Sequence, residues 1–295
     1  MVWEISLTNY YKYISIERNL SPNSVESYMR DITQFSKFTH KTPPLKIKRK
    51  HILDYINHIN EHSISARSQA RILSSIRSFY NFLIFENKLK IDPCEHIHSP
   101  KIGSKIPITL TVQEIDQIIS SIDLSKENGE RNRAIIECLY SCGLRVSELI
   151  TLKISNLLFE EKIVHVIGKG DKQRIVPLSK TLTKYLNNYI NFIRVKQKIN
   201  QHATDILFLN RRGNSISRIM IFNIIKDLSK SVGIQKKISP HTFRHSFATH
   251  LVEGGADLRV VQEMLGHTNI TTTEIYTHLN NDYLRQEIIN YHPRS

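Results

Sequence analysis

The side chains best suited to chemistry in this 295-residue chain gather near its C-terminal end. His241 and Arg244 are three residues apart, so they share one face of a helix that Ser239 and Pro240 are suited to begin. Backbone N–H groups and the helix dipole favour an anion at such an N-terminus. A guanidinium and an imidazole beside it suit a phosphate better than a carbonyl group or a metal ion.

Two further residues extend this arrangement. His267 follows the glycine that ends a second predicted helix, which Asp257 can cap. Tyr276 comes nine residues later, on a third helix that Thr271 and Glu274 can open with a capping box. A phosphate clamp followed by a phenol predicts chemistry in which a hydroxyl group attacks phosphorus.

These motifs resemble the C-terminal signature of the tyrosine recombinases, also called the phage integrase family. The signature comprises His-x-x-Arg, Leu-Gly-His and a following tyrosine, which stand here at residues 241–244, 265–267 and 276. Each motif is common alone, but all three in this order and at this spacing are specific. The resemblance implies a site-specific DNA recombinase that works through a covalent bond to tyrosine.

An upstream motif, Gly143–Leu149, reads Gly-Leu-Arg-Val-Ser-Glu-Leu and resembles the first arginine box of that family. The resemblance places Arg145 in the catalytic site and gives Glu148 the role of supporting it. Taken alone, the spacing describes a surface arginine that pairs with Glu148 three residues later.

A β-hairpin is predicted next. Residues 162–167 and 174–178 are rich in β-branched side chains, and a turn with Gly168 and Gly170 on either side of Lys169 joins them. An unremarkable basic hairpin has the same pattern, and the Walker loop that would support ATP binding is absent. In the family a lysine of this turn acts as general acid, so Lys169 is the match and Lys172 the fallback.

The resemblance therefore implies a phosphoryl transfer without metal, ATP or other cofactor. Its catalytic set, with Tyr276 as nucleophile, is Arg145, Lys169, His241, Arg244, His267 and Tyr276. A zinc site is the competing hypothesis, because His241, His245 and His250 lie close together in the sequence. The motif His-Glu-x-x-His is absent and Arg244 would repel a cation, so no metal site is predicted.

The first hundred residues predict a set of helices that would position a separate DNA-binding surface. Apolar residues at helical spacing mark helices near residues 10–16, 22–38 and 51–59, and a longer one capped by Ser65. One face of the last helix carries Arg67, Arg71, Ser74 and Ser78. This face is either simply solvated or suited to a DNA backbone. Lys172 and Arg218 are the further DNA-contact candidates.

The predicted fold is mainly α-helical with a small β-hairpin or sheet. The resemblance divides it into an N-terminal helical, SAM-like core-binding domain at residues 1–91, a linker at 92–107 and a C-terminal α+β catalytic domain at 108–295. Prolines and glycine interrupt the proposed linker. Apolar residues after position 282 either fold back or dock on another protomer, and the resemblance implies the protomer contact.

The formal net charge of +14 indicates an extended polyanion as partner. No apolar run approaches the ~20 residues of a membrane span, and no signal peptide is recognised at the first residues. Three cysteines do not make a disulfide framework, which favours a reducing cytoplasm, and the nucleoid is the expected location.

Residues 255–262 and the ending His292-Pro293-Arg294 look like the Xer subgroup of the family. That resemblance implies double-stranded DNA with a dif-like core site and a tetrameric synapse, in which a paralogous, XerC-like recombinase takes part in strand exchange through a Holliday junction. It also implies an FtsK-like DNA translocase as regulator, and the resolution of chromosome dimers at cell division. The alternatives are the integrase of a mobile element, which an arm-binding domain before Met1 would favour, and a non-catalytic DNA-binding relative.

Overall fold

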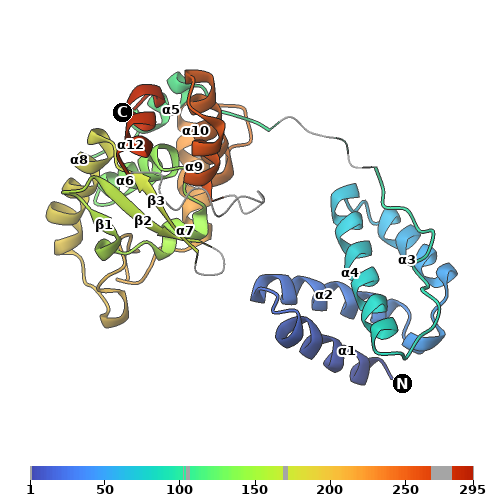
Figure 1. Cartoon of the computed structure of the whole chain (residues 1–295). Helices are drawn as coiled ribbons and strands as arrows, with labels where there is room; N and C mark the ends of the chain where they lie inside the picture. The colour runs from blue at the N-terminus through green and yellow to red at the C-terminus, as the bar shows by residue number, and fades with distance from the viewer. Residues whose placement is uncertain (1, 102, 104–106, 169–171, 267–280, 295) are drawn as a thin grey trace. The chain divides into compact units, whose positions relative to one another are not determined.

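The computed structural model describes residues 2–101, 103, 107–168, 172–266 and 281–294, and its chain divides into two compact units (Figure 1). The first unit is Met1–Lys105 and the second is Ile106–Ser295. Each unit has its own hydrophobic core. The predicted fold class, mainly helical with a small antiparallel sheet, is confirmed.

The described residues of the first unit form four α-helices around an aromatic core. They are α1 (Trp3–Lys12), which continues into a π-helical turn (Tyr13–Glu17), α2 (Pro22–Phe38), α3 (Arg49–Glu61) and α4 (Ala66–Phe85). Pro22 stands at the first position of α2, and Ser65 caps α4 by accepting a hydrogen bond from the N–H of Ser68 at 3.3 Å, as predicted. Tyr10 and Phe79 lie edge to face at 5.3 Å in the core.

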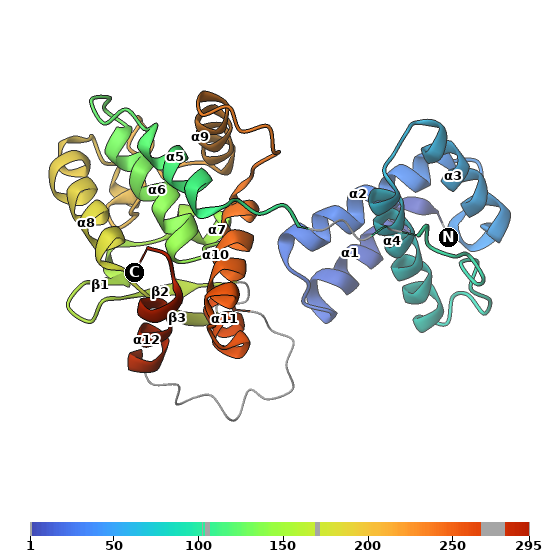
Figure 2. The ribbon, with the colours of Figure 1, turned by 90° about the horizontal axis from the view of Figure 1, so that it is seen from above.

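The second unit combines α-helices with a three-stranded antiparallel sheet (Figure 2). Its first helices are α5 (Val112–Ser120), α6 (Gly129–Ser141) and α7 (Val146–Thr151). The strands β1 (Leu157–Leu158), β2 (Ile163–Ile167) and β3 (Gln173–Pro177) pair in the order β1-β2-β3. After the sheet, the described part of the chain forms the α-helices α8 (Lys180–Asn188), α9 (Arg218–Ser231), α10 (Pro240–Gly254), α11 (Leu258–Leu265) and α12 (Asn281–Tyr291).

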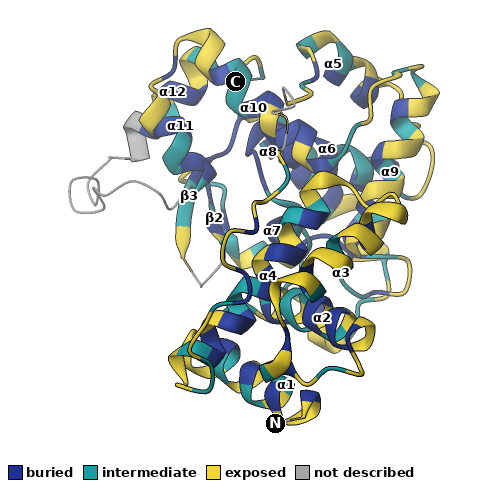
Figure 3. Cartoon of the chain, turned by 90° about the vertical axis from the view of Figure 1, so that its right-hand side faces the viewer, coloured by how far each residue is buried: buried dark blue, intermediate teal, exposed yellow. Residues whose placement is uncertain are grey.

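The core of this unit includes residues of α6, which contacts both α8 and α10, together with residues of the sheet, and much of the ribbon of these helices is coloured as buried in Figure 3. Tyr140 of α6 and Phe243 and Phe247 of α10 are fully buried there. The helices α11 and α12 both contact β3. These contacts fix the ends of α7, α10 and α11 relative to the hairpin, and those ends carry the predicted site.

Three local predictions differ from the structure. The short strand β1 was not predicted, because two residues carry no periodicity. The sequence of residues 182–199 predicts a single α-helix, but in the structure the α-helix ends at Asn188 and the chain continues as a π-helical turn (Tyr189–Ile193) and a 3-10 turn (Arg194–Lys196). The sequence also predicts a helix over residues 133–141, which in the structure begins earlier, at Gly129.

The C-terminal helix α12 folds back on its own unit. Leu284 and Ile288 are buried in the same core as α6 and α10. Arg294 donates a hydrogen bond to the buried carboxylate of Glu137 at 2.8 Å and pairs with Asp116. Folding back was one of the two arrangements considered from the sequence, and contact with another protomer remains a prediction.

Candidate active site

Arg145 and Glu148 form the first part of the site at the start of α7. The N–H of Arg145 donates to Oε2 of Glu148 at 2.8 Å, and its Nη1 donates to Oε1 at 2.8 Å. This is a capping box, in which the third residue of the helix reaches back to the residue before it. The Glu148 side chain is 3% exposed and that of Arg145 is 33% exposed. The pairing expected from the sequence is present, and Arg145 retains access to solvent.

Arg244 lies near the start of α10 and is buried. The start of α10 agrees with the prediction, since Pro240 is its first residue, and the helix ends before Gly255, which has a φ of +111°. Nη1 of Arg244 donates to the carbonyl of Gly143 at 2.6 Å, and Nη2 donates to the carbonyl of Leu265. Arg244 therefore joins α10 to the chain just before Arg145 and to the end of α11.

A third arginine, Arg174 of β3, completes the cluster and was missed in the sequence. Its Nη1 and Nη2 donate to the two oxygens of Glu148 at 2.8 and 2.7 Å, and its Nε donates to the carbonyl of Met264 at 2.6 Å. The available signal was a charged residue in a strand that continues as Ile175-Val176. An arginine there needs a partner if its side chain points inward.

The last carbonyls of α11 bring the three arginines together. Those of Met264, Leu265 and Gly266 accept hydrogen bonds from Arg174, Arg244 and Arg145 respectively, the last at 3.3 Å. The final carbonyls of a helix have no partner within the helix and form the negative end of its dipole. The helix end therefore holds three guanidinium groups near one another.

The cluster carries excess positive charge. Burial alone would raise the pKa of Glu148, but the hydrogen bonds and charge of Arg174 and the N–H and guanidinium of Arg145 lower that pKa overall. Burial, followed by the charge of Arg145, lowers the pKa of Arg244 to about 10, so its guanidinium stays protonated at neutral pH. Three guanidinium groups face one carboxylate, and this imbalance suits a phosphodiester anion.

His241 lies exposed on the first turn of α10. Partial burial, followed by the charges of His245, Arg244 and Arg145, lowers the pKa of this imidazole. The neutral form therefore predominates at neutral pH, and a neutral imidazole can accept a proton.

Three of the predicted catalytic residues, Lys169, His267 and Tyr276, lie outside the described residues. The residues that flank the hairpin turn are described, and the N–H of Gly168 donates to the carbonyl of Lys172 at 2.8 Å. A Cβ placed on Gly168 would lie 3.6 Å from Oε1 of Glu148 and 3.8 Å from Nη1 of Arg174. The described end of the hairpin thus borders the arginine cluster.

The predicted DNA-contact residues are divided between the two units. In α4, Arg67 and Ser74 are exposed, while Ser78 accepts a hydrogen bond from the hydroxyl of Tyr10 at 2.8 Å. Arg71 pairs with the buried Asp31 of α2, so an acidic residue of a neighbouring helix neutralises part of the positive charge on this face. Lys172 and Arg218 are exposed in the second unit.

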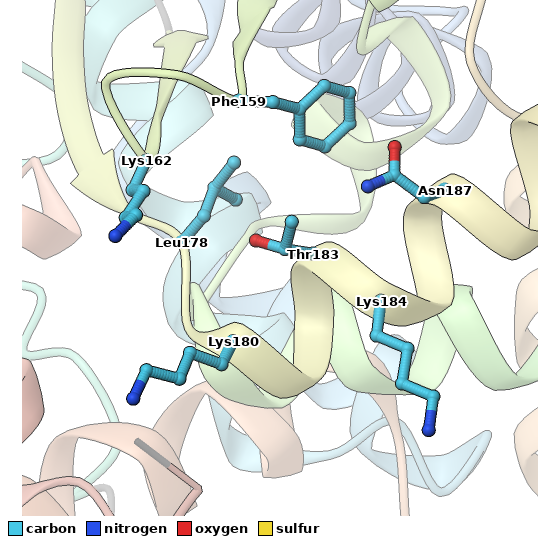
Figure 4. Close-up of a pocket in the computed structure, with 7 residues that line it drawn as sticks. All are labelled: Phe159, Lys162, Leu178, Lys180, Thr183, Lys184 and Asn187. Atoms are coloured by element: carbon cyan, nitrogen blue, oxygen red, sulfur yellow. The ribbon is translucent and has the colours of Figure 1, made fainter.

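Three other features bear on function in the described residues: groups that could bind a metal ion, helices that could span a membrane, and a pocket. No group of three or more His, Cys, Asp or Glu side chains is placed to hold a metal ion among them. None of the helices they form is long and apolar enough to cross a membrane. A pocket of about 260 Å³ beside α8 is lined partly by Lys162, Lys180 and Lys184, whose ammonium groups point apart (Figure 4). It contains none of the predicted site residues.

Comparison with known proteins gives two family matches. Residues 109–282 match the phage integrase family, and residues 7–87 match the N-terminal SAM-like domain of phage integrases. The chain is 41% identical to the tyrosine recombinase XerD of Staphylococcus haemolyticus over 295 residues, covering 99% of this chain and 100% of the relative.

Solved structures give the same result for the fold. The XerA recombinase is 32% identical, with a TM-score of 0.51 and coverage of 98% of this chain and 99% of that one. The XerH recombinase bound to its palindromic difH substrate is 22% identical, with a TM-score of 0.73 and coverage of 95% and 83%.

Proposed function

This chain belongs to the phage integrase family and is a site-specific tyrosine recombinase of the Xer subgroup, and from that premise we propose how its own residues cut and rejoin DNA. Tyr276 attacks a DNA phosphodiester, so that a bond forms between its phenolic oxygen and phosphorus while the bond to the 5′-oxygen breaks. The products are a 3′-phosphotyrosyl enzyme and a free 5′-hydroxyl. The phosphoester energy is retained in the covalent intermediate, so rejoining needs no ATP.

The remaining roles follow the charge that develops on phosphorus. Arg145 and Arg244 hold the non-bridging oxygens, and His267 donates a further hydrogen bond. His241, whose neutral form predominates, takes the phenolic proton, and Lys169 gives a proton to the leaving 5′-oxygen. Glu148 keeps Arg145 in place. The observation that carries this proposal is the cluster of three arginines on one buried carboxylate, in which Arg145 alone is substantially exposed.

The test is covalent trapping on a nicked, double-stranded suicide substrate. The unmodified protein is expected to form a covalent adduct, Tyr276→Phe to form none, and Arg145→Ala to form it ~10²–10³ times more slowly. Tyr283→Phe serves as the matched control and should leave the adduct intact. An adduct that persists in Tyr276→Phe rejects this nucleophile, whereas binding without any adduct in the unmodified protein identifies a non-catalytic relative.

The biological setting belongs to the same proposal. We infer a dif-like core site, a synapse of four protomers that includes an XerC-like paralogue, regulation by an FtsK-like translocase, and chromosome-dimer resolution in the cytoplasm at the nucleoid. XerH, a structural neighbour, is bound to a palindromic difH substrate, which supports a palindromic site here. In this proposal residues 1–91 form the domain that clamps the DNA duplex, residues 92–107 form the linker between the two domains, and residues 108–295 form the domain that catalyses DNA cleavage and rejoining. Footprinting on replication-terminus DNA tests the site, and protection spread evenly over unrelated DNA would contradict it.

A further inference from the structure

Arg174 connects three separately formed parts of the site. Its own strand, β3, leads out of the hairpin, its two terminal nitrogens hold both oxygens of Glu148 at the start of α7, and its Nε holds the carbonyl of Met264 at the end of α11. A planar guanidinium makes such a forked contact because its donors diverge at fixed angles. Loss of this side chain would remove two of the four hydrogen bonds that Glu148 accepts and the contact at the Met264 carbonyl, so it would loosen Glu148 and the end of α11 together.

Arg174 differs from Arg145 in access. Its side chain is 8% exposed, against 33% for Arg145, and it packs against Gly266, the residue that ends α11. A Cβ placed on Gly266 would lie 3.2 Å from Cδ of Arg174. All three guanidinium nitrogens of Arg174 already donate to Glu148 and Met264, so this side chain is placed to support the residues that meet the phosphate and not to contact the phosphate itself.

The partners of Arg174 also separate it from other buried arginines. Arg194 donates to the backbone carbonyls of Ala203, Thr204 and Ile206, and among the described residues none of its hydrogen bonds reaches Arg145, Glu148 or Arg244. Arg194 thus stabilises a loop, whereas Arg174 holds a residue, Glu148, that in turn holds Arg145 by 2.8 Å contacts. The two arginines make a matched pair for experiment.

We propose that Arg174 is a positioning residue for DNA cleavage, which fixes Glu148 and the last turn of α11 so that Arg145 and Arg244 are ready to bind the scissile phosphate. This inference rests on the catalytic roles proposed above for those two arginines. It assigns to Arg174 no direct contact with DNA. Its contribution lies in the rate of the cleavage step, and not in the affinity for the duplex.

The experiment compares Arg174→Gln, Arg174→Lys and the control Arg194→Lys in the full-length protein. Single-turnover cleavage of the suicide substrate is measured at saturating protein, DNA affinity by fluorescence anisotropy, and folding by thermal unfolding. Misplacing a catalytic group by about 1 Å costs on the order of 10²-fold in rate, so Arg174→Gln should cleave about 10²-fold more slowly. Arg174→Lys keeps the positive charge but loses the forked hydrogen bonds to Glu148, so it should cleave about tenfold faster than Arg174→Gln and still more slowly than the unmodified protein.

The expected pattern is slower cleavage with the dissociation constant for DNA changed by less than about twofold, and with the control cleaving normally. Unchanged cleavage in Arg174→Gln overturns the inference, as does a loss of DNA affinity that accounts for the slower cleavage. If Arg174→Gln does not fold, Arg174→Lys decides: a folded, slower enzyme supports the role, and either normal cleavage or an unfolded chain overturns it. A lack of adduct in the unmodified protein would instead reject the proposed function.

Discussion

Replacing Glu148 with glutamine removes the only carboxylate among the three described guanidinium groups. Glu148 accepts four hydrogen bonds of 2.7–2.8 Å, two from Arg145 and two from Arg174, and its Oε2 lies 3.9 Å from Nη1 of Arg244. The amide would turn an N–H group towards these donors. We therefore expect the Glu148→Gln variant to lose stability as well as the correct orientation of Arg145.

The expected loss of stability in Glu148→Gln follows from the burial of the groups involved. Removing one partner of a buried ion pair costs about 3–5 kcal/mol, because the remaining charge stays buried without compensation. Arg174 and Arg244 are 8% exposed, whereas Arg145 at 33% is partly screened by solvent, so the lower figure of about 3 kcal/mol applies. For a unit of this size each kcal/mol shifts Tm by about 2–4 °C, which gives a fall of about 6–12 °C.

The assay is thermal and urea unfolding followed by circular dichroism at pH 7. Glu114→Gln is the matched control, because its carboxylate pairs with Lys236 near the surface and glutamine can retain the capping-box bond to Thr111. That change should cost less than about 1 kcal/mol. The reasoning fails if Glu148→Gln unfolds at the same temperature as this control.

The pH dependence gives an independent check. The pKa of Glu148 is lowered in the folded protein, so its contribution is fully present above the pKa of an unfolded glutamate, about 4.3. The contribution is lost as the pH falls through the lower, folded pKa. The stability gap between the unmodified protein and Glu148→Gln should therefore be constant from pH 7 to about 5 and narrow below that. A gap that widens in acid would refute the assignment.

Three further predictions follow from other parts of the chain. Burial, followed by the charges of His250 and Arg294, lowers the pKa of His292 to about 3 in the folded protein. Below pH 6.5 only the unfolded state then binds a proton at this residue, so the free energy of unfolding should fall by about 1.4 kcal/mol for each pH unit. His292→Asn should flatten this slope, which urea unfolding at pH 4–7 measures. Arg71→Ala should weaken DNA binding and reduce the salt dependence of affinity by about one unit of slope in anisotropy titrations, whereas an unchanged slope would leave this side chain outside the interface. Gly143→Ala should lose about 2–4 kcal/mol in urea unfolding, because Gly143 has a φ of +56° and its Cβ would lie 2.6 Å from Phe247; a cost below 1 kcal/mol would contradict this geometry.

Local signals in the sequence predicted the helix ends well, because capping depends on residues three or four positions apart. Thr111 and Glu114 stand three residues apart and form a capping box, and Asp257, predicted as a cap, accepts a hydrogen bond from the N–H of Arg259 at 2.7 Å. Gly266 ends α11 with a φ of +65°, as a glycine in that position should. The contact between Arg145 and Glu148 followed from the same short-range rule.

Contacts between side chains far apart in the sequence could not be predicted from these short-range rules. Arg174 lies 26 residues from Glu148, and Arg71 lies 40 residues from Asp31, so only the packing of separate elements brings each pair together. Sequence periodicity marks a buried face but gives no register between two elements. The positions of Arg145 and Arg244 were taken from family motifs, and the cluster that surrounds Glu148 required the folded chain.

The three consecutive carbonyls at the end of α11 impose a strict length on this segment. Each residue inserted into an α-helix turns everything beyond it by about 100° and advances it by 1.5 Å. One added or deleted residue between Asp257 and Gly266 would direct the carbonyls of Met264, Leu265 and Gly266 away from their three arginines. Related chains should therefore tolerate substitutions along α11 far more readily than any change in the number of its residues.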